Sequence, residues 1–222
     1  MSFDHRKSTE NWARIDYDRD VWFLIPLAFK GTKWADAAEW AFDYAGDRFL
    51  RGGRELTKKV VKKEVLPFAQ ALVRGQSEIV GSVAAHKLYF HCPDYTKMPV
   101  AVAIALWKRE GTREEAFQHY SYFGTKSATV QPVAEWFETE ALGRGVKAQW
   151  SGVTEIGQYD QVNYIFRDDD FDTDVHVFLM SWDHQRFLEV LPDLDAFVRS
   201  IRCIPDPDKT GTGSTGQAPA TS

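Results

Sequence analysis

The sequence predicts an α+β fold, in which an antiparallel sheet is flanked by helices and preceded by a helical N-terminal extension. Apolar residues recur every three or four positions between residues 34 and 74, as in amphipathic helices. Short apolar runs of strand length then fill most of residues 87–182, and a further amphipathic pattern closes the chain at residues 187–202. Strands that follow one another with few intervening helices favour an antiparallel sheet over an alternating α/β arrangement.

The first 29 residues contain no predicted helix. Residues 1–16 show neither a helical nor a strand period, so we expect them to be unstructured. The apolar run 21–29 follows, and Pro26 within it argues against a central strand, which favours an edge strand or an extended segment laid on the core. A spanning helix needs about 20 apolar residues, so this run is too short to cross a membrane.

Two helices are expected next. Residues 34–50 form the first, with Gly31-Thr32 as the candidate cap at its start and Gly52-Gly53 at its end. The second covers about residues 54–74, with Gly75 as a candidate C-terminal cap. Pro67 lies inside it and removes one backbone donor, so a kink or break is expected there.

The second helix separates an apolar face from a basic one. Residues 48–63 hold seven basic side chains and one acidic side chain. A charge run of this kind is usually a solvated helix face, and the alternatives are docking to an acidic partner or contact with an anionic surface. Packing against the acidic segment 160–174 would reduce any such external role. The lysines of this face are Lys58, Lys59, Lys62 and Lys63.

The strand-rich part begins after Gly81. The box Thr112-Arg113-Glu114-Glu115 opens a short helix at about 112–123, because the threonine and glutamate side chains can cap each other's amides. An acidic turn at residues 167–172 joins the last two strands as a hairpin. The expected strands are 87–91, 100–107, 128–137, 146–156, 159–167 and 174–182, and the closing helix is 187–202.

Four regions follow from this reading. Residues 1–16 form a disordered N-terminus, 17–79 a helical extension, and 80–205 an α+β domain. Residues 206–222 are small and polar, so they should form a disordered tail.

The last two thirds of the chain resemble the PsbP-like fold family. The resemblance lies in the hairpin 159–182 and in the run Phe197-Val198-Arg199-Ser200-Ile201-Arg202, which is similar to the family's closing helix pattern. It covers about residues 80–204 and implies the fold, with no functional residue carried over. It also implies a non-enzymatic binding module, since some bacterial members act in the cytoplasm as adaptors or chaperones for secreted proteins. This chain adds residues 1–79 and shows no secretory signal.

Several motifs suggest chemistry but lack its full pattern. The aspartates of 168–174 have the alternate spacing of a calcium loop, yet the loop's glycine and final glutamate are missing, which favours a solvated turn. Ser181, Asp183 and His184 are neighbours at a strand end, where turn chemistry is the more common role. His86 and His91 should point to opposite faces of one strand. The glycines of 211–216 match a nucleotide-binding pattern without the strand and helix it requires. No catalytic residue, metal or cofactor is predicted.

The sequence therefore favours a cytoplasmic, non-enzymatic module that binds a protein partner, as an adaptor or chaperone for a secreted or assembled protein. The alternative is a small-ligand-binding protein or enzyme with a site between the N-terminal helices and the sheet, using His176, His184 and the carboxylates of 168–174. Cys92 and Cys203 fit a reducing compartment as small buried residues.

The partner surface is expected on the N-terminal extension, with weak contact to anionic surfaces as a further role. The formal charge of −5 argues against sequence-specific nucleic-acid binding. Clustered aromatic residues either pack in the core or supply rigid contact area to a partner. The candidate partner-binding residues are Trp22, Phe23, Trp34, Trp40, Lys58, Lys59, Lys62 and Lys63.

Overall fold

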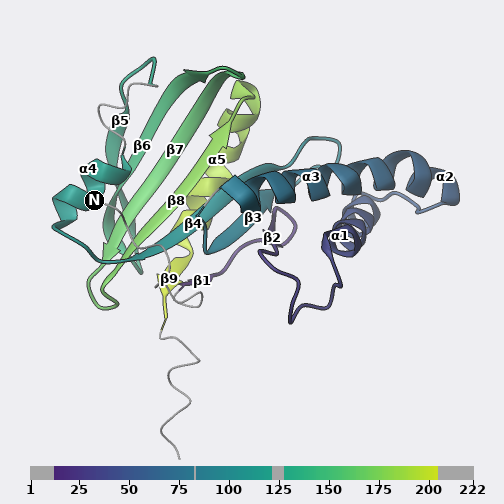
Figure 1. Ribbon diagram of the computed structural model, residues 1–222, viewed down its shortest axis with the longest axis horizontal. Coiled ribbons are helices and arrows are strands. Elements are labelled where there is room, and N and C mark those ends of the chain that lie inside the picture. Colours follow the sequence, from purple (N-terminus) through teal and green to yellow (C-terminus); the bar gives the residue numbers. More distant parts are fainter. Residues whose placement is uncertain (1–12, 83, 122–127, 205–222) are drawn as a thin grey trace, which may run out of the picture.

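A seven-stranded antiparallel sheet forms the centre of the computed structural model, which describes residues 13–82, 84–121 and 128–204 (Figure 1). The strand order is β2-β3-β4-β8-β7-β6-β5, and every neighbouring pair is antiparallel. The α+β class expected from the sequence is therefore confirmed. The strands are β2 (Trp22–Ile25), β3 (Lys87–His91), β4 (Val100–Lys108), β5 (Val133–Thr139), β6 (Gly143–Thr154), β7 (Gly157–Asp168) and β8 (Thr173–Ser181).

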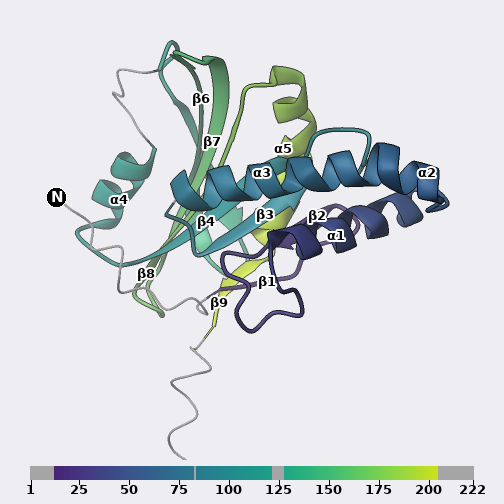
Figure 2. The same ribbon diagram turned by 45° about the vertical axis from the view of Figure 1, so that its right-hand side comes forward.

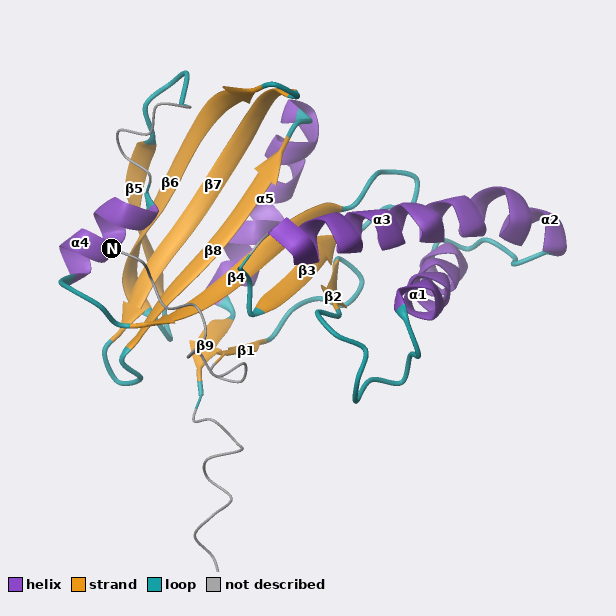
Figure 3. Cartoon of the chain, viewed as in Figure 1, coloured by secondary structure: helices purple, strands orange, loops and turns teal. Residues whose placement is uncertain are grey.

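Helices cover both faces of the sheet (Figures 1 and 2). The closing helix α5 (His184–Arg199) packs on one face, and α4 (Arg113–Tyr120) packs on the other. The long helical arm extends away from the β2 side of the sheet, as the purple helices of Figure 3 show. It consists of α1 (Ala37–Arg51), α2 (Lys58–Val60), the π-helical turn Val61–Val65 and α3 (Leu66–Ser82).

Alternation along the strands sorts the core into two layers. In β4, Val102, Ile104 and Leu106 face α5 and join its apolar residues in one cluster. Ala103 points to the opposite face, where it meets the apolar side of the arm. Each layer contains large side chains that are fully buried. Because some of them come from the arm, the arm shares a core with the sheet. The fully buried side chains on the arm's side include Ile25, Trp40, Leu72 and Leu88.

The structure places the helix ends of the arm differently from the expectation. Asp36, rather than Gly31-Thr32, caps α1, because its side chain accepts bonds from the amides of Ala38 and Glu39. The second helix runs on to Ser82, and Gly75 lies within it. A Cβ at Gly75 would lie 3.3 Å from the ring of Phe90, so this glycine permits close packing of α3 on β3.

Pro67 produces a π-helical turn in place of a break. The amide of Leu66 bonds to the carbonyl of Val61, one residue further back than in an α-helix. The helix continues through Pro67 because the widened turn just before it absorbs the change in hydrogen bonding. The expected irregularity is therefore present, with the helix intact.

The N-terminal strand was missed by the sequence analysis. Ala13–Ile15, within the segment expected to be unstructured, form β1, which pairs with β9 (Ile201–Cys203) at the end of the chain. Residues 1–12, and the glycine-containing tail 206–222, lie outside the described residues. The apolar run that follows supplies β2, an edge strand, as one of its two interpretations had it.

The closing helix and the β5 strand are shifted from their expected positions. The helix α5 spans His184–Arg199 where 187–202 was expected, so that Ile201–Cys203 are free to form β9, and β5 spans Val133–Thr139 where 128–137 was expected. Thr112 and Glu115 form the capping box of α4, and the acidic turn joins β7 to β8. The extension 17–79 contributes β2 to the main sheet, so it shares a core with the residues that follow it. None of the described helices combines the length and apolar character needed to cross a bilayer.

Candidate functional site

A groove opens on the α5 face of the sheet, between the first turns of α5 and the β5 edge. Its volume is about 420 Å³. The floor comes from β6 and β7, one wall from β5 and the residues before it, and the other wall from α5. The lining residues are Val130, Gln131, Val133, Glu135, Lys147, Gln149, Trp150, Ser151, Asp160, His184, Phe187 and Leu188.

A bulge in the edge strand creates the outer wall. Ala128 bridges Gly152, whereas Val133 pairs with Gln149, so four residues on the edge lie opposite two on β6. The extra residues loop out of the ladder and carry Val130 to the wall. Val130 and Val133 keep 60% and 70% of their surface exposed. The wall therefore offers apolar surface that the chain itself does not bury.

The floor is polar because alternate residues of β6 face α5 where the helix does not cover them. Lys147, Gln149 and Ser151 share this face through the period of two along a strand. In β4 the corresponding face is apolar and packed under α5. This change from apolar to polar positions marks where the core ends and the groove begins.

One end of the floor is held by a charge cluster. The Nζ of Lys147 donates to both carboxylate oxygens of Asp195 on α5, at 2.9 and 3.1 Å, and Lys147 is 6% exposed. The Tyr164 hydroxyl donates to the same carboxylate at 2.6 Å. Burial and this carboxylate both raise the pKa of Tyr164, so the phenol stays protonated as a donor. The cluster ties β6 and β7 to α5.

The other end holds a serine, an aspartate and a histidine. Ser151 Oγ donates to Asp160 Oδ1 at 2.6 Å, and His184 Nδ1 lies 2.8 Å from Asp160 Oδ2. Asp160 is 5% exposed, while the His184 side chain is 69% exposed. The carboxylate lies between the other two groups, so the histidine cannot take the serine proton as it does in a Ser-His-Asp triad. The arrangement orients His184 at the mouth of the groove.

The aromatic residues expected to contact a partner are mostly core. Trp22, Phe23 and Trp40 are buried, at 3%, 6% and 1% exposure. Trp34 is half-buried, and its indole nitrogen donates to Asp43 at 2.9 Å. Three of these four side chains thus act in packing, which is the other interpretation that the sequence left open.

The four lysines of the arm are exposed at its far end, which we call the basic tip (Figure 1). The nearby Arg54 instead pairs with Glu64 at 2.7 Å. Arg48 and Arg51 turn back toward the chain, where Arg48 donates to the carbonyl of Asp20 at 2.5 Å and Arg51 pairs with Asp47 at 2.8 Å. The basic tip comprises Lys58, Lys59, Lys62 and Lys63.

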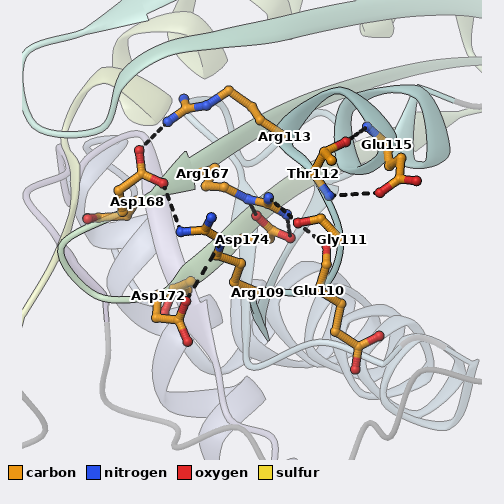
Figure 4. A network of polar contacts seen from close by, with 12 residues as sticks. Arg109, Glu110, Gly111, Thr112, Arg113, Glu115, Arg167, Asp168, Asp172 and Asp174 are labelled. Carbon is orange, nitrogen blue, oxygen red and sulfur yellow. Dashed lines mark hydrogen bonds and ion pairs between the residues drawn. The ribbon is translucent and has the colours of Figure 1, made fainter.

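The acidic hairpin lies at the other end of the molecule, and nearby arginines neutralise part of its charge. Arg167 is 2% exposed, forms two bonds to Asp174 at 2.6 and 2.8 Å and donates to the carbonyls of Glu110 and Gly111 (Figure 4). Asp169 pairs with Arg113 at 2.5 Å. The two charged regions therefore do not meet, and the basic tip is not covered by the hairpin.

The residues of the alternative ligand-binding or enzymatic site do not lie together. His176 is buried beside Tyr120 under α4, while His184 lies on the α5 face and the hairpin carboxylates bind arginines. Asp183 caps α5 by accepting from the amide of Arg186, and Ser181 bonds to the backbone of Asp183. The interface between the arm and the sheet, where this site was expected, is packed with apolar side chains.

No metal centre is found in the part of the chain that the structure describes, since no three His, Cys, Asp or Glu side chains are placed to share an ion. His91 is 1% exposed and binds Asp193 on α5 at 2.8 Å. Its partner on the other ring nitrogen is Arg186, at 3.0 Å. Cys92 and Cys203 are buried free thiols, and burial raises the pKa of Cys92 to about 11.

The groove escaped the sequence analysis because its residues come from four separate elements. Lys147 and Asp195 are 48 positions apart, and neither stands out locally. The detectable signal was the run of alternate polar residues at Lys147, Gln149 and Ser151 in a strand with apolar neighbours. No family model matches the sequence, and a search of curated proteins gave no match. The PsbP-like resemblance thus stays a prediction.

Proposed function

We propose that this protein is a non-enzymatic binding module that holds an extended segment of a protein partner in the groove between α5 and β5. The observation that carries the proposal is the exposed apolar wall beside β5, an edge strand whose outer side pairs with no other described strand. Val133 on β5 and Leu188 on α5 face the groove from its two sides, with 70% and 47% of their surfaces exposed. Exposed apolar surface lining a concave site is typical of an interaction surface.

The β5 edge supports the same conclusion. A free edge presents unpaired backbone groups that can pair with another strand, and proteins usually shorten or cover such edges. At the opposite edge, β2 has only four residues and Pro26 follows it. β5 is longer, with seven residues, although Pro132 directly precedes it as Pro26 follows β2. An added strand at β5 would supply backbone hydrogen bonds while its side chains reach the groove.

The charges of the groove favour a partner segment with basic as well as apolar residues. Glu135 on the wall is exposed, and its nearest recorded cation is Lys147, 3.9 Å away. That lysine is already bound at 2.9 Å to Asp195, and Asp160 adds a further carboxylate. The carboxylates of Glu135, Asp160 and Asp195 outnumber the basic side chains beside them, Lys147 and His184. Complementary charge helps to set the register of a bound segment.

The groove chemistry supports binding over catalysis. Ser151 donates to the carboxylate of Asp160, which is a weaker base than the histidine that removes the proton of a serine nucleophile in a Ser-His-Asp triad. Lys147 and Tyr164 are both bound to Asp195. An adaptor or chaperone role, in the cytoplasm or elsewhere, would follow from the identity of the partner.

Site-specific crosslinking in the native host tests the proposal. A photoreactive phenylalanine replaces Val133 in one variant and Leu188 in a second, and Leu24 in a control. Leu24 is 46% exposed but lies on β2, at the far edge of the sheet. We expect both groove variants to crosslink to one and the same polypeptide, and the Leu24 variant not to do so.

Binding to the purified partner then decides the question. We expect Leu188→Asp to weaken its affinity at least tenfold, which is about 1.4 kcal/mol. Leu24→Asp, the matched control, should change the affinity less than twofold. Crosslinks of equal yield from Leu24, or an affinity unchanged by Leu188→Asp, would overturn the proposal.

A further inference from the structure

The basic tip groups four positive charges that no ion pair among the described residues matches. Lys58, Lys59, Lys62 and Lys63 are all exposed, and no ion pair joins any of them to a described acidic residue. Two acidic residues lie beside them: Glu64 is held by two bonds of 2.7 Å from Arg54, and Glu55 is exposed three positions before Lys58. The acidic hairpin lies at the opposite end of the molecule (Figure 1).

The position of these lysines in their helix strengthens the local field. The helix begins at Lys58, with Thr57 as its N-cap. A helix start carries a partial positive charge and favours acidic side chains, but this one has no acidic residue in its first turn. Four ammonium groups within its first two turns therefore repel one another and the helix end. An external anionic surface would relieve this repulsion.

The kind of basic residue favours a lipid surface over other anionic partners. Arginine is the residue that matches phosphates in nucleic acids, and protein interfaces are depleted in lysine. The tip holds lysines alone, whose flexible, hydrated charges suit a diffuse layer of headgroups. Leu66 follows within a turn of Lys62 and Lys63 and is 40% exposed. Exposed leucine beside lysines is typical of helices that lie at a membrane interface.

We infer that the basic tip docks the protein onto the surface of an anionic lipid bilayer. The contact is peripheral, through the tip lysines with Leu66 inserted among the headgroups. The groove lies between α5 and β5, away from the tip, so the two surfaces can be occupied together (Figure 1). The inference rests on the tip alone and does not require the groove to bind a partner.

Vesicle sedimentation with the full chain tests this inference. The probes are vesicles of neutral phosphatidylcholine and vesicles in which a third of the lipid is phosphatidylserine. We expect binding to the anionic vesicles only, and its loss at high salt, because screening weakens exposed charge interactions. Each lysine near an anionic surface contributes about fivefold to partitioning, so Lys62→Gln with Lys63→Gln should reduce it about 25-fold.

A matched double variant separates the tip from net charge. Lys30→Gln with Lys108→Gln removes the same charge from exposed positions elsewhere and should reduce partitioning less than twofold. Circular dichroism of each variant checks that it is folded. Three outcomes would overturn the inference: equal binding to neutral vesicles, equal loss in both double variants, or tighter binding to a DNA duplex or to polyglutamate than to anionic vesicles.

Discussion

The acidic β7–β8 hairpin and the basic tip both concentrate charge of one sign, yet the chain treats them in opposite ways. Three hairpin carboxylates, those of Asp169, Asp172 and Asp174, are matched by arginines that reach them from β7 and from the residues around the start of α4 (Figure 4). The tip lysines have no such partners among the described residues. Charge that is matched internally serves the fold, and charge left exposed at one end is available for an external contact.

Removing Arg167 should have the largest effect on stability. Arg167→Met leaves the buried carboxylate of Asp174 without its partner, so we expect the free energy of unfolding to fall by about 3–5 kcal/mol. Urea denaturation followed by tryptophan fluorescence measures this change.

The double variant Arg167→Met/Asp174→Leu removes both charges and should recover part of the loss. A decrease below about 1 kcal/mol in the single variant would contradict the view that this pair is an internal match.

His176 is buried like Arg167, but one of its ring nitrogens has no hydrogen-bond partner among the described residues. This nitrogen is Nε2, and burial, with a smaller contribution from His119, lowers the pKa of His176 to about 3. The unfolded histidine has a pKa of about 6.5, so between these values the unfolded chain binds the additional proton. Stability should therefore fall as the pH falls below about 6.5, by up to about 1.4 kcal/mol per pH unit from this group.

His176→Phe should flatten this part of the pH profile relative to the native chain. Thermal unfolding between pH 7 and pH 5 measures the difference, and His184→Gln, which leaves His176 in place, should keep the His176-dependent slope. An unchanged slope in His176→Phe would show that other groups set the acid sensitivity.

The exposed part of the hairpin should matter much less than its buried pair. Asp169 is 57% exposed at its side chain and pairs with Arg109 and Arg113. We expect Asp169→Asn to cost less than about 1 kcal/mol, and the cost to shrink in high salt. If Asp169→Asn lowered the free energy of unfolding as much as Arg167→Met, the distinction between the buried and the exposed charge pairs of the hairpin would not hold.

The smallest effect on folding is expected at the tip. Replacing Lys58, Lys59, Lys62 and Lys63 with glutamine should change the free energy of unfolding by less than about 0.5 kcal/mol, or raise it slightly as repulsion is relieved. Urea denaturation at low salt checks this. A marked destabilisation would mean that the lysines serve the fold, as the hairpin charges do.

Local patterns predicted most of the strands, because each strand is defined by its own run of apolar residues. The residues of β3 lie where expected, and Thr112 caps α4 through the predicted box. Three-residue β1 was missed because Ala13–Ile15 are too few to show a period. Gly75 was misread as a helix end, since only the ring of Phe90 explains why a glycine lies there.

The candidate site was largely beyond sequence reasoning. The exposed lysines of the tip could be seen in the sequence, but their separation from the acidic hairpin depends on the fold. The groove depends on a bulge before β5 and on the part of β6 and β7 that α5 leaves uncovered, and both are tertiary features. Aromatic content was a poor guide, because Trp22 and Trp40 are buried in packing.

The pairing of β1 with β9 joins the two ends of the described chain and bears on the order of folding. Ala13 lies opposite Cys203, so this ladder closes the longest loop in the molecule. By contrast, β5, β6, β7 and β8 are neighbours in both sequence and sheet. Loop closure costs more entropy as the loop lengthens, so the meander of β5 to β8 is expected to form first and β1–β9 last. In native-state hydrogen exchange, the β1 amides should be among the first to open.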